Sequence, residues 1–249
     1  NSSISKAKPA DPKKYLRLHN LVEGISIAAG IPKPRIYIIE DTAPNAFATG
    51  RNPQNAVICV TTGLLQKMNR LELEGVIAHE ISHIKNFDIR MMTITVVLVG
   101  IIALISDIIL RAFFWGSIAG RRGGGDRGNA ILIIIGLIFA ILAPIIATLI
   151  RMAISRKREF LADADGALLT RYPEGLAKAL VKIHNDKEAL KAANKATAHL
   201  YIINPLRFKK GWLNHIFSTH PPLKSRIAAL RNINVKEVEK QLKAKSAKA

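Results

Sequence analysis

The chain has 249 residues, 49% of them hydrophobic, and a formal net charge of +19. Because its mean hydropathy is also positive, the composition is unusual for one soluble domain and typical of a basic domain attached to a membrane. The lysines and arginines are scattered without interleaved aromatic residues, which argues against a nucleic-acid-binding module and favours attraction to an anionic membrane surface.

The N-terminal third predicts a helix followed by a small sheet. Residues 1–14 have the composition of a linker emerging from an upstream segment, and no signal peptide is recognisable. Residues 15–29 carry apolar side chains at helical spacing and stop at Gly30. Turn-forming residues then separate three strand-like runs, 35–39, 46–49 and 56–61. We expect a small antiparallel sheet, whose edge strand would bind an extended substrate backbone.

The next segment carries the motif His79-Glu80-Ile81-Ser82-His83. Residues 71–90 contain no proline, and Asn69 with Glu72 resembles a capping box, so a helix is predicted. Two histidines four residues apart on a helix can bind one metal ion, usually zinc, and Glu80 beside them can deprotonate the attacking water. The alternative, a solvated helix with two chance histidines, fits poorly with the surrounding Ile, Val and Ala residues.

Two apolar segments follow. Residues 130–150 contain no charge over a length that spans the hydrocarbon core of a bilayer. Residues 91–110 are apolar apart from Asp107, which lies near the far end of the segment, where an acid is less costly. Pro144 would kink the second span without breaking it. The alternative, buried helices of a large soluble core, is less compatible with the uniform apolarity of 130–150.

A third metal ligand is expected after the second span. Glu159 is the candidate, and Asp163 would lie one helical turn further, where it could accept the ring N–H of a ligating histidine. Two crossings return the chain to its starting side, so Glu159 can meet the histidines. The alternative is that Glu159 belongs to a charged helix face, paired with Arg156 and Arg158.

The orientation in the membrane rests on flanking charges. Basic residues on the domain side of the spans outweigh those on the loop side, which favours a cytoplasmic domain. The lack of any cysteine besides Cys59 agrees, since exported domains of this size often carry disulfides. Cys59 has no partner cysteine for a zinc site, and we expect it to be buried in a strand.

These features, in their order along the chain, resemble the HtpX family, membrane-embedded zinc endopeptidases of bacteria and archaea related to the CAAX prenyl proteases. The matching stretches are SIAAG (26–30), PRIYIIEDTAPNAFATGRNP (34–53), VTTGLL (60–65), LEGVIAHEISHIKNFDI (73–89), EFLADADG (159–166) and FSTHPPLKSRIAAL (217–230). Members of this family usually carry two further transmembrane helices upstream of the matched region.

The resemblance implies a role for each matching residue. His79, His83 and Glu159 would bind zinc, with Glu80 as the general base and Asp163 as the acid that supports a ligating histidine. His220 and Arg226 are similar to a late pair that holds the substrate carbonyl or the developing oxyanion. From the residues alone, His220 before two prolines would be an ordinary loop residue.

The resemblance also assigns the substrate side of the site. The run Asn45, Ala46, Phe47 and Ala48 resembles the family's substrate-binding strand. For Phe47, packing in the core of the sheet is an equally good interpretation of the sequence.

The expected fold is α+β: a zincin-like, mainly helical metallopeptidase domain with a small antiparallel sheet and a transmembrane helical hairpin. Its parts would be a linker (1–14), the two halves of the peptidase domain (15–90 and 151–234), the hairpin (91–150) and a basic solvated tail (235–249).

The expected function is zinc-dependent endopeptidase activity, with one Zn²⁺ per chain. By resemblance, the protein would be a multi-pass protein of the cytoplasmic membrane and would cleave misfolded or damaged membrane proteins. Its partners would be polypeptide substrates and the lipid bilayer, not nucleic acid, and the sequence does not predict an oligomeric state. The alternatives are a CAAX-type processing peptidase and an inactive membrane scaffold.

Overall fold

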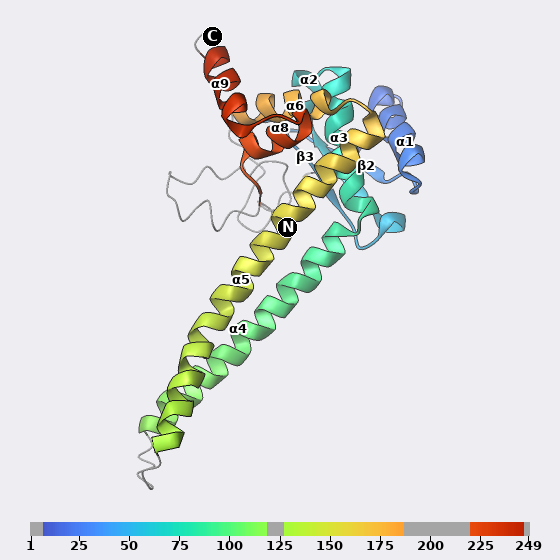
Figure 1. The fold of residues 1–249 in the computed structure, drawn as a ribbon. Coiled ribbons are helices and arrows are strands. Elements are labelled where there is room, and N and C mark those ends of the chain that lie inside the picture. The colour runs from blue at the N-terminus through green and yellow to red at the C-terminus, as the bar shows by residue number, and fades with distance from the viewer. Residues whose placement is uncertain (1–6, 119–126, 187–219, 247–249) are drawn as a thin grey trace. The chain divides into compact units, whose positions relative to one another are not determined.

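The computed structural model describes residues 7–118, 127–186 and 220–246. The chain divides into two units: a first unit of Asn1–Arg90 with Ser155–Ala249, and a second unit of Met91–Ile154. Two long helices, α4 (Asp88–Ile118) and α5 (Arg127–Thr170), contribute residues to both units (Figure 1).

The first unit contains a four-stranded sheet of order β1-β2-β4-β3. The three predicted strands are present as β2 (Arg35–Ile39), β3 (Ala46–Thr49) and β4 (Val57–Thr61). A fourth strand, β1 (Lys8–Pro9), forms within the predicted linker and pairs antiparallel with β2.

The sheet is mixed, whereas the sequence predicted antiparallel pairing throughout. β2 and β4 are parallel neighbours, and β3 pairs antiparallel with β4 on its far side. The segment that connects β2 to β3 crosses the end of β4. There the Thr61 hydroxyl donates to the Ala43 carbonyl at 2.8 Å and accepts from the Asn45 N–H at 2.8 Å. This connection places β3 at the outer edge of the sheet.

Helix α3 (Arg70–Lys85) begins with the predicted capping box. The Asn69 side chain accepts from the Glu72 N–H and the Glu72 carboxylate accepts from the Asn69 N–H, both at 2.9 Å. The helix does not continue to residue 90. It ends at Lys85 with Asn86 as its C-cap, Phe87 takes a left-handed φ of 56°, and α4 starts at Asp88.

The core of the first unit lies between the sheet and helices α1 (Leu16–Ala29), α3 and α6 (Pro173–Asn185), whose apolar side chains form one buried cluster. Helices α3 and α6 approach closely at Gly75, where a Cβ atom would lie 2.5 Å from the backbone nitrogen of Leu176. Only glycine permits this approach, which holds the metal-motif helix tightly against its neighbour.

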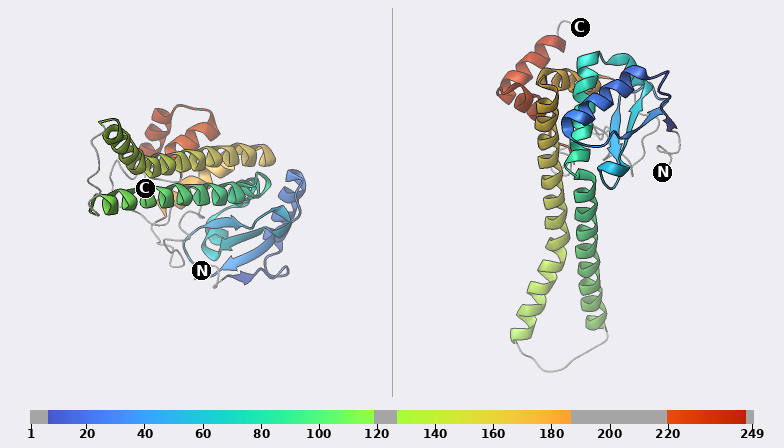
Figure 2. Two further views of the ribbon diagram at one scale, coloured as in Figure 1. Left: turned by 90° about the horizontal axis from the view of Figure 1, so that it is seen from below. Right: turned by 90° about the vertical axis from the view of Figure 1, so that its right-hand side faces the viewer.

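The C-terminal helices α8 (Leu223–Arg231) and α9 (Val235–Ser246) pack side by side (Figure 2). The predicted solvated tail therefore starts as a packed helix, because Val238 is fully buried against Ile227 and Ala228 of α8. Arg231 joins α8 to α6 through two hydrogen bonds to the Glu174 carboxylate, at 2.8 and 2.7 Å.

The helices of the second unit are long and apolar enough to cross a membrane, with candidate spans at Asp88–Ala112 and Gly136–Thr170. Only 6% of the apolar stretch of the first span and 17% of that of the second are buried, whereas a core helix of a soluble protein would be mostly buried. Asp107 forms an ion pair with Arg111 at 2.7 Å, which reduces the cost of an acid in a span. A mainly helical α+β fold with a small sheet and two apolar helices is confirmed.

Candidate metal centre

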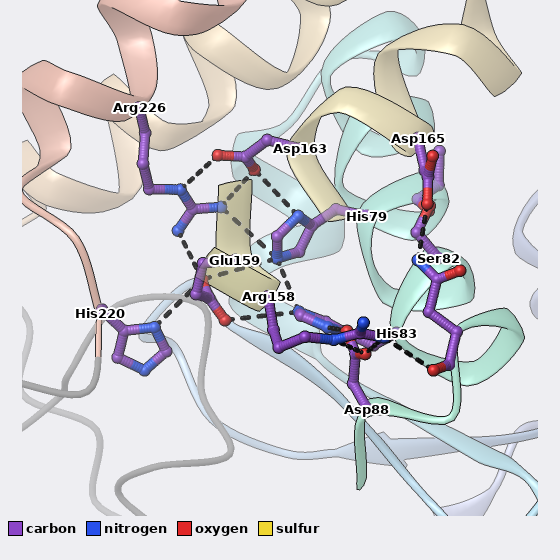
Figure 3. Close-up of polar contacts among 12 residues, drawn as sticks. His79, Ser82, His83, Asp88, Arg158, Glu159, Asp163, Asp165, His220 and Arg226 are labelled. Atoms are coloured by element: carbon purple, nitrogen blue, oxygen red, sulfur yellow. Dashed lines mark hydrogen bonds and ion pairs between the residues drawn. The ribbon is translucent and has the colours of Figure 1, made fainter. Parts of the chain in front are cut away.

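The two motif histidines lie one turn apart on α3, in the interior of the first unit (Figure 3). Their Nε2 atoms are 3.1 Å apart. The His79 Nδ1 atom lies 3.0 Å from Oδ1 of Asp163, and the His83 Nδ1 atom lies 2.7 Å from Oδ2 of Asp88. Because each Nδ1 atom faces a carboxylate, both Nε2 atoms are left to face a common point.

Glu159 on α5 completes this arrangement. Its carboxylate oxygens lie 3.9 Å from Nε2 of His79 and 3.4 Å from Nε2 of His83. One ligand atom from each of the three residues lies within 4.8 Å of the others. A tetrahedral ion with bonds of about 2.0–2.1 Å places its ligand atoms about 3.3 Å apart, so the donor set fits such an ion.

Arg226 of α8 connects this helix to α5, which carries Glu159 and Asp163. Its Nε and Nη2 atoms donate to the two oxygens of Asp163 at 2.7 and 2.6 Å, and its Nη1 atom lies 3.2 Å from Oε2 of Glu159. Burial alone would lower the pKa of Arg226, but the charges of Asp163 and Glu159 raise it above its ordinary value. The guanidinium therefore remains charged although only 2% of the residue is exposed.

His220 enters the centre from the segment before α8. Its Nδ1 atom lies 3.1 Å from Oε2 of Glu159 (Figure 3). A residue that the sequence alone would place in an ordinary loop thus lies beside the candidate metal ligands.

Glu80 is buried next to the histidines and contacts the sheet. Burial raises the pKa of its carboxyl above the ordinary value, although the neighbouring histidines oppose this shift. The carboxylate accepts a hydrogen bond from the backbone N–H of Ala48 on the edge strand β3. Glu80 is thus a carboxyl group with increased proton affinity, held between the histidines and the edge of the sheet.

Comparison with known proteins identifies the family of this site. The family described as Peptidase family M48 matches residues 12–234. The chain belongs to peptidase family M48. This family membership makes it a metallopeptidase, as the sequence predicted.

Its M48 relatives include proteins named Protease HtpX homolog. The relative from Thermoanaerobacter pseudethanolicus is 53% identical over 92% of this chain and 76% of its own length. The relative from Dictyoglomus turgidum is 56% identical over 88% of this chain and 70% of its own length. The predicted resemblance to HtpX is therefore confirmed over most of the chain.

A solved structure shares the fold. The crystal structure of S. mikatae Ste24p superposes with a TM-score of 0.59 at 22% identity, covering 90% of this chain and 52% of Ste24p. The fold of this M48 chain thus corresponds to about half of that larger protein.

The M48 site contains two residues that the sequence analysis missed, Asp88 and Arg158. Asp88 binds His83 and also accepts hydrogen bonds from the Arg158 guanidinium, which donates in addition to the Asn86 carbonyl at 2.7 Å. Arg158, considered above as a partner of Glu159, thus binds Asp88. The sequence did offer a signal for Asp88: it is an aspartate five residues after the second histidine, at the start of an apolar segment.

The predicted substrate strand Asn45–Ala48 is divided between the core and the sheet edge. The Phe47 side chain is buried against Ile39 and Cys59, which supports its interpretation as a core residue. Thr61 N–H donates to the Asn45 carbonyl at 3.0 Å, so by alternation the backbone groups of Ala46 and Ala48 face away from β4. Among the described residues, no strand pairs with this outer edge.

Proposed function

We propose that the protein is a zinc-dependent endopeptidase of the cytoplasmic membrane that hydrolyses peptide bonds in misfolded or damaged membrane proteins. The observation that carries this proposal is the convergence of two imidazole Nε2 atoms and one carboxylate on a single point, next to the buried carboxyl of Glu80. Two histidines and one glutamate form a ligand set of catalytic zinc sites, which keep a fourth position for water.

His79, His83 and Glu159 would hold the ion. When bound, zinc would polarise the scissile carbonyl and lower the pKa of water at the site to about 7. Asp163 and Asp88 would fix the ring orientations of the two histidines.

Glu80 would act as the general base and then as the general acid. Its raised pKa favours proton uptake from the attacking water, and the same carboxyl can pass the proton to the leaving amine. His220 would stabilise the oxyanion. Arg226, whose nitrogens face Asp163 and Glu159, would act mainly by positioning these two acids.

The edge strand β3 would bind the substrate. The carbonyl groups of Ala46 and Ala48 face the open edge, so an extended peptide can add to the sheet there. Because the Ala48 N–H binds Glu80, a peptide paired with β3 would pass beside the general base.

Two further observations support the membrane location and the substrate class in this proposal. The exposed apolar helices and the basic residues that flank them support a multi-pass protein with its first unit in the cytoplasm. The relatives named Protease HtpX homolog support quality control of membrane proteins as the role.

The test is cleavage of an unfolded membrane protein in detergent, together with zinc content, for wild type, Glu80→Gln and Glu74→Gln. Glu74 lies on the same helix outside the centre and is the matched control. We expect about one zinc per chain in all three proteins and loss of cleavage only in Glu80→Gln. Near-native cleavage by Glu80→Gln would refute its role as the base, and absence of zinc from wild type would refute the metal assignment. Cleavage of a lipidated C-terminal peptide but not of membrane proteins would indicate a CAAX-type processing peptidase.

A further inference from the structure

The break between α3 and α4 exposes an aromatic side chain. Phe87 adopts a left-handed backbone conformation, which is rare for a bulky residue, and 44% of it is exposed. The Arg158 guanidinium holds this conformation by binding the Asn86 carbonyl and the Asp88 carboxylate on either side. The fold therefore places Phe87 at the surface of the first unit.

The loop after β3 meets this break. Gly50, Arg51 and Asn52 line the same cavity as Phe87 and Arg90. The cavity measures about 10 Å³, which is the minimum for one water molecule, so the two segments are in close contact and leave no room for a small-molecule ligand. Gly50 makes the turn possible, because its φ is +134° and a Cβ atom would lie 2.5 Å from the Asn55 carbonyl oxygen.

Basic residues flank Phe87 in the sequence and in the adjoining loop. Arg51, Lys85 and Arg90 are exposed, and we call them, with Phe87, the interfacial patch. Two acids lie close to the patch, and both are engaged: Asp88 is buried and binds His83 and Arg158, and the half-buried Asp165 binds the Asn86 side chain at 2.6 Å.

The patch lies where the first candidate span begins. This span runs from Asp88 to Ala112, and exposed apolar side chains such as Met91 and Ile94 follow Arg90 directly. Aromatic residues and basic residues at such a boundary favour the interface and the anionic headgroups of a bilayer.

We propose that the interfacial patch docks the first unit on an anionic lipid surface, with Phe87 inserted at headgroup depth and Arg51, Lys85 and Arg90 facing lipid phosphates. The patch joins a loop of the sheet to the start of the span, so two separate segments of the first unit bind the bilayer. This role needs no metal and no activity, and it stands apart from the proteolytic function.

The test places single tryptophans in the 249-residue chain, with Trp115 and Trp212 replaced by phenylalanine. Phe87→Trp reports on the patch. Tyr172→Trp is the matched control, because Tyr172 is an exposed aromatic that lies with Leu71 beside Gly175, at the start of α3 and about 20 Å of helix from the break at its other end. Each protein is reconstituted in phosphatidylcholine vesicles with and without phosphatidylglycerol, and fluorescence is quenched with brominated lipid or with iodide.

We expect brominated lipid to quench the Phe87→Trp protein and iodide to quench the Tyr172→Trp protein. Adding Arg51→Glu and Lys85→Glu to Phe87→Trp should reduce its lipid quenching only in phosphatidylglycerol vesicles, since each basic residue at an anionic surface changes partitioning about fivefold. As a second probe, Arg51→Cys carrying a nitroxide should report the same interfacial depth. The proposal is overturned if iodide quenches both tryptophan variants equally, or if the nitroxide at residue 51 is fully in water.

Discussion

Arg226 binds both carboxylate oxygens of Asp163, although the two residues are 63 positions apart. The same Asp163 carboxylate lies 3.0 Å from the Nδ1 atom of His79. One buried ion pair thus joins α8 to α5 and orients a candidate metal ligand on α3. By resemblance, Arg226 belongs to a pair that holds the substrate carbonyl or the oxyanion. In the structure its guanidinium contacts Asp163, Glu159 and His79, which adds a positioning role as a prediction.

Replacing Arg226 should therefore affect stability and the metal more than substrate binding. Arg226→Gln would leave Asp163 and Glu159 buried without their cation, at a cost of about 3–5 kcal/mol. We expect a lower midpoint of thermal unfolding in detergent and weaker zinc binding. Arg226→Lys, which keeps the charge, should recover part of both. An Arg226→Gln protein with unchanged zinc affinity but a raised KM would instead assign Arg226 to the substrate.

Asp88→Asn should weaken zinc binding by about 10–100-fold, because the carboxylate that orients His83 is lost. Competition with a chromogenic chelator measures this affinity without relying on activity. Asp165→Asn is the matched control, since Asp165 binds the Asn86 side chain and contacts no histidine in the described site. Equal affinities for Asp88→Asn and wild type would show that Asp88 has no part in holding the metal.

Backbone pairing with β3 predicts a sensitivity to N-methylation of the substrate. A peptide methylated at the amide that binds the Ala46 or Ala48 carbonyl should lose about 3–10-fold in kcat/KM, the value of one hydrogen bond. Methylation outside the segment that pairs with β3 should have no effect. A scan of singly methylated peptides measures this dependence, and a flat profile would exclude strand addition.

Gly75→Ala should destabilise the protein by about 1–3 kcal/mol, because the new Cβ would overlap the backbone of Leu176. Gly24→Ala is the control. Gly24 lies in α1, and a Cβ atom added there would meet no atom within 4 Å, so alanine should stabilise the helix by about 0.5–1 kcal/mol. Thermal unfolding in detergent should shift in opposite directions for the two variants.

Cys59 should resist alkylation in the folded protein. Burial, together with the charge of Glu80, raises the pKa of its thiol to about 12, so the thiol keeps its proton at pH values where an exposed thiol ionises. At a pH of about 8.5 its thiolate fraction is lower by about a thousandfold than in the unfolded chain. Iodoacetamide labelling with and without denaturant measures the difference. Rapid labelling of the native protein would contradict the burial of Cys59.

Regular helical spacing explains why the two histidines could be paired from the sequence, whereas Glu159 was chosen by its position and by the resemblance to HtpX, and His220 and Arg226 by the resemblance alone. His79 with His83, and Glu159 with Asp163, each lie four residues apart, so both pairs have to share a helix face. Asp88 was not predictable in this way. On a continuous helix, a residue five positions after His83 would point about 140° away from it around the axis. The break at Phe87 turns Asp88 back toward the histidine.

Features that depend on tertiary packing were also missed. Strand positions were read from residue types, but the direction of β2 relative to β4 depends on a connection fixed by the Thr61 hydroxyl. Helix α9 was not predicted because Val235 and Val238 lie among lysines, and the burial of Val238 against α8 depends on tertiary packing. Core packing of Phe47 was one of two interpretations left open by the sequence, and its burial against Ile39 and Cys59 supports that one.

Asp88 belongs both to a candidate membrane span and to the candidate metal centre, and this has a structural consequence. The residue opens a candidate membrane span and also orients His83, while Glu159 belongs to a helix that contains the other span. Two side chains of the candidate metal centre are thus contributed by the helices that contain the candidate spans. Removing both whole helices to obtain a water-soluble protein would therefore remove Asp88 and Glu159, whereas removing residues 91–154 alone would keep both side chains in the first unit.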